Sequence, residues 1–135
     1  MPPVECQLAK VVMSESHDRQ VIVLQQKGAE RQFPIIIGFF EVYAIHRFVH
    51  NEPLARPLTH ELIGNILNSL DVSVDRIVVN DLKDTTFYAR IFLRRGDEIF
   101  EVDSRPSDAI AIAVQAGAPI FVEEHVLDQA SRDFG

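Results

Sequence analysis

The stretch FEVDSRPSDAIAIAVQAGAP, residues 100–119, decides how the second half of the chain folds. Every residue at positions 109–114 is apolar, so no face of this segment prefers water, and a helix of this kind is normally buried. Gly117 and Pro119 then supply a helix stop. The stretch therefore predicts a buried helix over residues 107 to about 116.

Three charged residues stand directly against this buried segment. Asp108 falls in the predicted first turn, where capping alone would select an aspartate because backbone amides and the helix dipole favour an anion there. Arg105 can form a bidentate ion pair with a neighbouring aspartate, or it can grip a phosphate. Asp103 alternates with Glu101 at the end of a strand, so the two share a face that could be a solvated surface or could hold a cation. Structural and ligand-binding readings both stay open.

Length and charge limit the classes of function. At 135 residues, the chain is predicted to be a single domain over 1–135 with a core that needs no metal or disulfide. Its net charge of −7, from 20 acidic and 13 basic residues, argues against a passive nucleic-acid coat, which would carry a basic excess. An enzyme that approaches phosphates through a divalent metal ion is compatible with an acidic balance.

The chain is expected to work in the cytoplasm without a membrane. Cys6 is the single cysteine and cannot form an internal disulfide, which favours a reducing compartment. The start MPPVECQLAK has no basic segment followed by an apolar one, so no signal peptide is expected. The longest apolar run, FPIIIGFF, is too short to span a bilayer.

The first half reads as strands followed by helices. Strands are predicted at residues 4–8, 21–24 and 33–37, the third of them central, and a helix at 39–49. A second helix is predicted to begin with Thr59 as its N-cap. Its apolar stripe consists of Leu62, Ile63, Ile66, Leu67 and Leu70. His60 and Glu61 are predicted to face away from that stripe.

The second half repeats this order. Strands at 74–79, 87–93 and 98–102 lead into the buried helix, and a short strand at 119–122 and a helix at 124–130 follow. Residues 37–45 align with residues 102–110, and both segments end in Ala-Ile on a helix. Such an echo can arise by chance or by duplication. It predicts an α+β domain with two pseudo-repeated halves around one curved, barrel-like mixed sheet.

The charged residues around Arg105 form one polar cluster, which we call a polar corner. A second polar corner lies at the start of the second helix. It consists of Arg56, His60 and Glu61. A histidine on a polar helix face is usually only solvated, but it can also serve as a general base or a metal ligand.

One strand interleaves aromatic and basic side chains. Along residues 87–94, one face carries Phe87, Ala89, Ile91 and Leu93, which predicts core. The other face carries Tyr88, Arg90, Phe92 and Arg94. Aromatics that alternate with arginines can stack single-stranded bases and neutralise their phosphates, although an ordinary half-exposed antiparallel strand has the same pattern. These residues are a candidate nucleic-acid track.

Five segments resemble one known family. FPIIIGFFEVYAI, RPLTHELIGNIL, TTFYARIFL, VDSRPSDAIAIAV and PIFVEEHVL follow in the order and spacing of the bifunctional nuclease (BFN) domain. The resemblance covers about residues 8–130, with 131–135 as a short tail. It implies an α+β fold with duplicated halves around one barrel-like sheet, and nuclease activity on DNA and RNA. It brings no established catalytic set, so the site is predicted from the residues of this chain.

We predict that the corners around Arg56 and Arg105 converge on one cleft of a metal-dependent nuclease. Its phosphate-binding residues would be Arg56, Arg105 and Ser107. Asp103 and Asp108 would hold a divalent cation, Mg²⁺ or Mn²⁺, that activates water and neutralises the leaving oxygen. His60 or Glu61 would handle a proton, so the predicted catalytic set is His60, Glu61, Asp103 and Asp108.

The rival hypothesis is a regulatory or protein-interaction module without enzymatic activity. In this case both corners are structural, and the sheet edge or the helix faces recruit a partner or a second copy of the chain. A homodimer is expected for such a small, apolar-rich domain. Corners that share one polar cleft favour the enzyme, and corners on opposite sides of the molecule favour the module.

Overall fold

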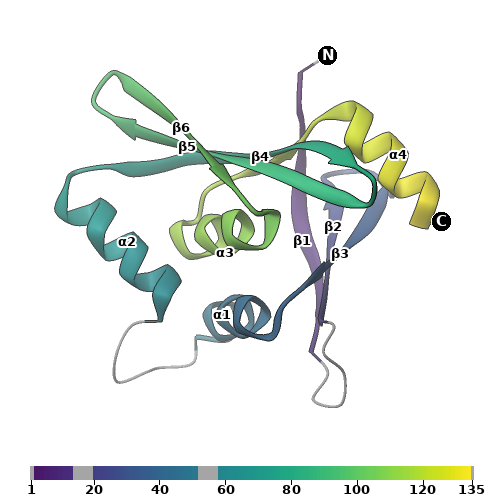
Figure 1. Ribbon diagram of the computed structural model, residues 1–135, viewed down its shortest axis with the longest axis horizontal. Helices are drawn as coiled ribbons and strands as arrows, with labels where there is room; N and C mark the ends of the chain where they lie inside the picture. Colours follow the sequence, from purple (N-terminus) through teal and green to yellow (C-terminus); the bar gives the residue numbers. More distant parts are fainter. Residues whose placement is uncertain (1, 14–19, 52–57, 135) are drawn as a thin grey trace.

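The computed structural model describes residues 2–13, 20–51 and 58–134. Runs of strands are followed by helices along the chain, the order expected for an α+β domain (Figure 1). In chain order they are β1 (Val4–Val12), β2 (Gln20–Gln26), β3 (Gln32–Ile37), α1 (Phe39–Val49), α2 (Thr59–Ser69), β4 (Ser73–Lys83), β5 (Thr86–Arg95), β6 (Glu98–Ser104), α3 (Pro106–Ala116), β7 (Ile120–Val122) and α4 (Glu124–Phe134). The predicted fold class is confirmed.

Within these described residues, seven strands form one mixed sheet in the order β3-β2-β1-β7-β4-β5-β6. All neighbouring strands are antiparallel except β4 and β7, which are parallel. Two meanders, β1-β2-β3 and β4-β5-β6, therefore flank the short central strand β7, and each meander leads into a helix. The sheet curls around these helices (Figure 1). This confirms the prediction of two pseudo-repeated halves around one curved sheet.

Two details of that prediction are wrong. The helices of the two halves begin at Phe39 and Pro106, whereas the sequence echo placed Phe39 opposite Ser104, two residues out of register. The third strand, β3, was predicted to be central but pairs with β2 at the edge of the sheet. Pro34 explains its position, because a residue without an amide donor is best tolerated on an edge strand.

The buried helix α3 lies at the centre of the domain. It packs against α1 and α2 on one side and against β4 and β5 on the other. Its apolar run is buried as predicted through Ala113, while Val114 is only partly buried and Ala116 is exposed. Small alanine side chains allow these close approaches, and Gly117 ends the helix in the left-handed conformation with φ 68°.

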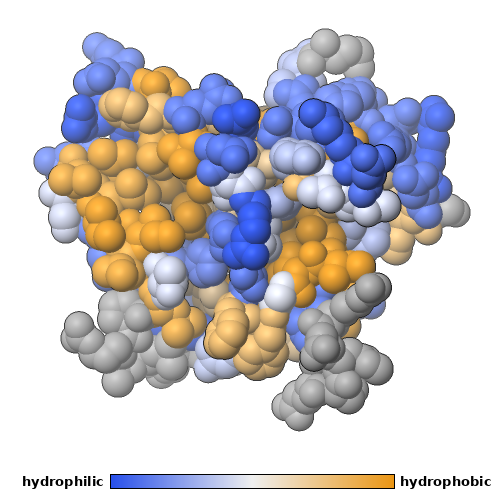
Figure 2. Space-filling view, in the orientation of Figure 1, coloured by the Kyte–Doolittle hydropathy of each residue, from blue (hydrophilic) through white to orange (hydrophobic). Residues whose placement is uncertain are grey.

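Helix α2 is rotated relative to the prediction. Its N-cap is Leu58, one residue before the predicted Thr59. Leu62, Ile66 and Leu70 are 51%, 49% and 59% exposed, although they were predicted to face the core. His60, predicted to face solvent, is only 9% exposed. Figure 2 shows the resulting apolar surface over α2, at the left of the view.

Candidate functional site

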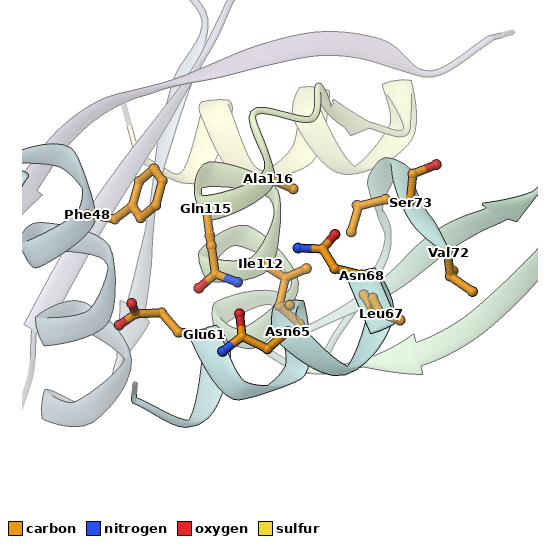
Figure 3. A pocket seen from close by; sticks show the side chains of 12 residues that line it. Phe48, Glu61, Asn65, Leu67, Asn68, Val72, Ser73, Ile112, Gln115 and Ala116 are labelled. Carbon is orange, nitrogen blue, oxygen red and sulfur yellow. The ribbon is translucent and has the colours of Figure 1, made fainter. Parts of the chain in front are cut away.

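Two hollows flank helix α2, and the first one holds Glu61. This hollow has a volume of about 440 Å³ and lies between α2 and the last turn of α3 (Figure 3). Glu61 is bound there by the buried Arg47 of α1 through two contacts, Nη1 to Oε1 at 2.9 Å and Nη2 to Oε2 at 3.1 Å. Glu61 was predicted to move a proton. The observed ion pair instead gives it a structural partner that links α1 to α2.

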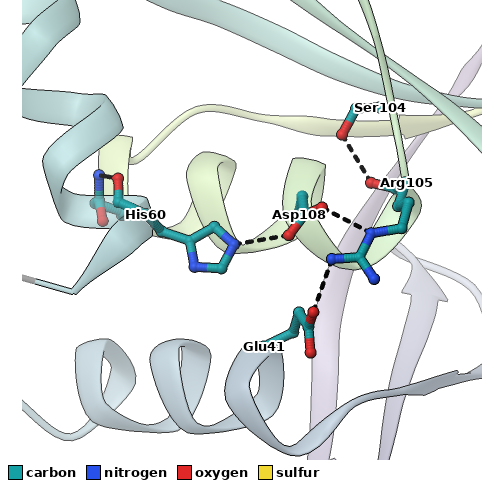
Figure 4. Close-up of polar contacts among 6 residues, drawn as sticks. Glu41, His60, Ser104, Arg105 and Asp108 are labelled. Carbon is teal, nitrogen blue, oxygen red and sulfur yellow. Dashed lines mark hydrogen bonds and ion pairs between the residues drawn. The ribbon is translucent and has the colours of Figure 1, made fainter.

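The second hollow brings His60 of one predicted corner together with Asp103, Arg105 and Asp108 of the other. It has a volume of about 590 Å³ and lies between α2, the beginnings of α1 and α3, and the inner face of strands β5 and β6. Four polar residues along it form a continuous chain of contacts (Figure 4). We call Glu41, His60, Arg105 and Asp108 the polar row, and this hollow the polar-row cavity.

Asp108 is the centre of the polar row. Its Oδ1 lies 2.9 Å from Nε2 of His60, and its Oδ2 accepts a hydrogen bond of 2.9 Å from Nε of Arg105. Nη2 of Arg105 donates in turn to Oε1 of Glu41 over 2.7 Å. The row thus joins side chains from α1, α2 and α3 that are far apart in the sequence.

The first turns of three helices position these side chains. Glu41 and Asp108 are each the third residue of their helix, and His60 is the second residue of α2. Carboxylates are favourable there because the amino end of a helix carries partial positive charge. Gly38, before α1, leaves room for Glu41, since a Cβ at this position would lie 2.5 Å from its Oε2. The local structure therefore directs both acids toward Arg105.

Close packing of α2 on α3 holds His60 in place. The Nε2 of Gln115 donates a 2.8 Å hydrogen bond to the backbone oxygen of His60. A Cβ on Gly64 would overlap the amide of Gln115, so glycine at this position lets the two helices approach. This contact and the Arg47–Glu61 ion pair turn the first turn of α2 inward.

Asp108 lies in the first turn of α3 as the capping interpretation predicted, but its side chain also has partners beyond the helix end. The N-cap of α3 is Arg105, which makes no side-chain cap hydrogen bond, and both oxygens of Asp108 engage other side chains. Burial by itself raises the pKa of Asp108, but the hydrogen bonds from Arg105 and His60 outweigh it and hold the pKa below its ordinary value. The hydrogen bonds that Arg105 donates to Asp108 and Glu41 raise the pKa of Arg105. At neutral pH the row therefore contains a carboxylate and a guanidinium in fixed contact.

The pairing also orients the imidazole of His60. With Nε2 facing a carboxylate, the neutral ring carries its proton on Nε2 and keeps a lone pair on Nδ1, an assignment that follows from the hydrogen-bond network. A histidine ordered in this way can accept a proton at Nδ1 while Asp108 stabilises the resulting cation.

The predicted metal pair is not assembled in the described residues. Asp103 lines the polar-row cavity, but its side chain is exposed and its Oδ1 lies 4.0 Å from Nε of Arg90. Both oxygens of Asp108 are engaged by His60 and Arg105. Among the described residues, no group of three or more His, Cys, Asp or Glu side chains could hold a metal ion. The cation role of the two aspartates stays a prediction.

One described residue of the predicted phosphate-binding set, Ser107, lies apart from the row. Ser107 is 7% exposed and lines a different hollow, on the side of α3 that faces β3 and the start of β5. Arg56 lies outside the described residues. Of the predicted phosphate-binding set, Arg105 is the member that the structure places in the cavity.

The candidate nucleic-acid track lies on the opposite face of β5 from the polar-row cavity. Ile91 and Leu93 line the cavity, while Arg90 and Phe92 line a hollow on the other side of the sheet. The alternation along β5 is therefore as predicted. The basic groups of the track lie close to acids, with Arg94 Nη2 3.1 Å from Asp75 and Arg90 Nε 3.8 Å from Glu101. Whether Tyr88, Arg90, Phe92 and Arg94 bind nucleic acid stays a prediction.

Sequence reasoning missed Glu41. The signal that identifies it is the pseudo-repeat: when the halves are aligned at the helix starts, Phe39 and Pro106, Glu41 falls opposite Asp108. The alignment of residues 37–45 with 102–110 is out of register by two residues. It placed Glu41 opposite a proline and hid its equivalence to Asp108.

The fold and the polar row define an α+β domain whose cavity carries a histidine, an arginine and three carboxylates. Residues 22–134 of the chain match the family model of the bifunctional nuclease domain. A Mycobacterium tuberculosis protein described as uncharacterized is 36% identical over 93% of this chain and 75% of its own length. Bifunctional nuclease 2 of Oryza sativa subsp. japonica is 31% identical over 80% of this chain and 34% of its own length. Bifunctional nuclease 1 of Arabidopsis thaliana is 25% identical over 78% of this chain and 34% of its own length. The chain belongs to the bifunctional nuclease domain family, as its motifs predicted.

Proposed function

We propose that this chain is a nuclease that hydrolyses phosphodiester bonds of DNA and RNA in the polar-row cavity. The supporting observation is the hydrogen bond between His60 and Asp108, which joins the two sequence corners in one hollow. The family and the names of the plant relatives, bifunctional nucleases, support the same activity. The plant relatives are about three times as long as the segment they share with this chain, so their whole activity enters here only as part of the proposal.

His60 is the proposed proton-transfer group. Phosphodiester hydrolysis needs a water deprotonated for attack, and Nδ1 of His60 is the ring nitrogen not turned toward Asp108. Asp108 is the proposed positioning residue, since its hydrogen bond to Nε2 fixes the orientation of the ring. General acid–base catalysis of this kind contributes a factor of about 10² to 10⁴ in rate.

Arg105 is the proposed phosphate-binding residue. Its side chain is 66% exposed, so an incoming phosphate can reach the guanidinium. Nε and Nη2 contact the two carboxylates, and an arginine has five N–H donors in all, which leaves donors for a phosphate oxygen. A guanidinium held by two acids is pre-oriented, which lowers the entropic cost of binding.

A divalent cation, Mg²⁺ or Mn²⁺, is the proposed cofactor, held jointly with the substrate. Mg²⁺ is commonly bound by one or two carboxylates together with substrate phosphates, so a preformed cage is not required. Asp103, Glu41 and Asp108 all line the cavity and supply carboxylates of the right kind. When bound, the cation would neutralise charge that develops on the leaving oxygen.

The second candidate function is an interaction module, a homodimer in solution. The observation that favours it is the exposed stripe Leu62, Ile66 and Leu70 on α2, because contiguous apolar surface marks interaction sites.

None of the helices in the described part of the chain is long and apolar enough to cross a bilayer. We propose the cytoplasm as the compartment, since a chain with one free cysteine and no internal disulfide suits a reducing environment.

Cleavage of labelled DNA and RNA oligonucleotides by the purified protein tests the proposal. Mg²⁺, Mn²⁺ and EDTA are compared for the wild type and for His60→Ala. The matched control is His125→Ala, because His125 also faces a carboxylate, Asp81 at 3.6 Å, but lies on α4 away from the cavity. We expect metal-stimulated cleavage that His60→Ala lowers by about 10²-fold or more and His125→Ala leaves unchanged. Equal activity in wild type and His60→Ala would contradict the proposal.

A further inference from the structure

Apart from the row, the lining of the polar-row cavity is mainly aliphatic, and we call this part the aliphatic wall. It is built by side chains from four elements, each of which lines the cavity: Ile63 and Leu67 of α2, Ile91 and Leu93 of β5, Val102 of β6 and Ile112 of α3. A site for a phosphate alone would need only the polar side. A ligand that fits the whole cavity must therefore carry an anionic group and an apolar surface next to each other.

An exposed aromatic ring also lines this cavity. Phe40 lines it from the first turn of α1 and is 82% exposed. Its ring contacts Phe39 edge-on, with centroids 6.1 Å apart and planes at 78°. Aromatic side chains in this situation stack on unpaired bases of single strands, which is sequence-tolerant because every base has a π face.

We propose that the aliphatic wall and Phe40 bind an unpaired nucleobase beside the phosphate held by Arg105, so that the substrate is single-stranded nucleic acid. The proposal rests on the nuclease function above. The cavity of about 590 Å³ is within the usual range of small-molecule sites, about 300–1,000 Å³, and can enclose one nucleotide.

Double-stranded nucleic acid does not fit this wall. In a duplex the bases are paired and stacked inside, and the charged backbones are turned outward. Placing phosphate oxygens against six aliphatic side chains would remove their water without giving hydrogen bonds in return, which is costly. An unpaired base gains from the same contact, because its faces are removed from water.

A nucleotide and the corresponding sugar phosphate, which lacks the base, test the base contact directly. Binding of AMP and of ribose 5-phosphate is measured by calorimetry without divalent cations, so the readout does not depend on catalysis. We expect AMP to bind at least about tenfold more tightly than ribose 5-phosphate. Val102→Asp and Phe40→Ala should each reduce this ratio, because the phosphate repelled by the added carboxylate is common to both ligands, whereas only AMP carries a base.

The control is Ile99→Asp on the same strand. Ile99 is about as exposed as Val102, 44% against 41%, but it pairs with Arg94 and so belongs to the outer face of the sheet, whereas Val102 pairs with Ile91 of the cavity. Ile99→Asp should keep the wild-type ratio of AMP affinity to ribose 5-phosphate affinity. Equal binding of the two ligands by the wild type would overturn the proposal. So would a wild-type dimer that Val102→Asp separates and Ile99→Asp does not, because the wall would then be an interface between copies.

Cleavage separates this proposal from the one on which it rests. One oligonucleotide is supplied as a single strand and as a blunt duplex, and we expect the single strand to be cut at least about tenfold faster. Equal rates on both substrates, still lost in His60→Ala, would overturn the base site and leave the nuclease function standing. Absence of cleavage together with an AMP preference would support the base site and contradict the nuclease.

Discussion

Glu41 and Asp108 occupy the same place in the two halves of the molecule, and Arg105 donates a hydrogen bond to each of them. Both are the third residue of the helix that follows a three-stranded meander. Arg105 Nη2 contacts Glu41 at 2.7 Å, and Arg105 Nε contacts Asp108 at 2.9 Å. The pseudo-repeat thus supplies two equivalent carboxylates to one guanidinium, while His60 contacts only the one on α3.

The charge of Glu41 should weaken anion binding at Arg105. Glu41→Gln keeps the size of the side chain and an oxygen acceptor but removes a negative charge next to the proposed phosphate position. Without divalent cations, we expect ribose 5-phosphate to bind about threefold or more tightly to this variant than to the wild type. Asp81→Asn, which removes an acid paired with Lys83 and His125, is the control. Unchanged or weaker binding by Glu41→Gln would show that phosphate does not approach Arg105.

The Arg47–Glu61 ion pair should act on stability. Arg47→Met leaves Glu61 without its partner in a partly buried place, and removing one member of a buried pair typically costs about 3–5 kcal/mol. We expect a loss in the free energy of unfolding at or below the lower end of this range, since Glu61 keeps some contact with water. The double variant Arg47→Met with Glu61→Leu should lose less than the sum of the single changes. Denaturant unfolding of all four proteins measures this, and strict additivity would argue against a coupled pair.

Acid should destabilise the protein in part through Asp108. Its pKa is lower in the folded chain than in the unfolded one, so the unfolded state binds more protons and stability rises with pH. The contribution is complete above the unfolded pKa of about 3.9 and is lost as pH falls through the lower folded pKa. Asp108→Asn should show a shallower decline of the free energy of unfolding between about pH 5 and 2. Parallel curves for the two proteins would contradict the pairing.

The exposed stripe on α2 should be covered by a second copy of the chain if the protein is a dimer. Leu62→Gln with Ile66→Gln places polar groups on this stripe, away from the side chains of the polar row. Sedimentation of the wild type should give a dimer and that of the variant a monomer, with cleavage retained. A wild-type protein that is monomeric at micromolar concentration would contradict the proposed homodimer.

Local patterns predicted the elements well, because each is determined by its own residues. Helix α1 runs over Phe39–Val49 as expected, and the all-apolar run of α3 required burial. The rotation of α2 could not be predicted in this way. Its apolar stripe favoured one face, but Asp108 holds His60 inward, and this partner is 48 residues away in the sequence.

The candidate site was predictable in part for the same reason. Asp108, Arg105 and His60 could be selected because charge beside a buried helix and a histidine at a helix start are unusual locally. Their contacts depend on how three helices meet, which no local pattern contains. Glu61 was placed in the site because it is next to His60, yet consecutive helix residues point in different directions, and Arg47 binds it outside the cavity.

Asp108→Asn, assayed for cleavage and melting temperature on one preparation, tests the central claim most directly. Asparagine has nearly the same shape, and the lost ion pairs are partly exposed, so the free energy of unfolding should fall by only about 1 kcal/mol. Glu124→Gln, which disrupts the Arg31–Glu124 ion pair outside the cavity, controls for loss of an acid. If the polar row is the catalytic centre, Asp108→Asn remains folded and cleaves about 10²-fold or more slowly, while Glu124→Gln cleaves normally. A folded Asp108→Asn protein with full activity would contradict the account.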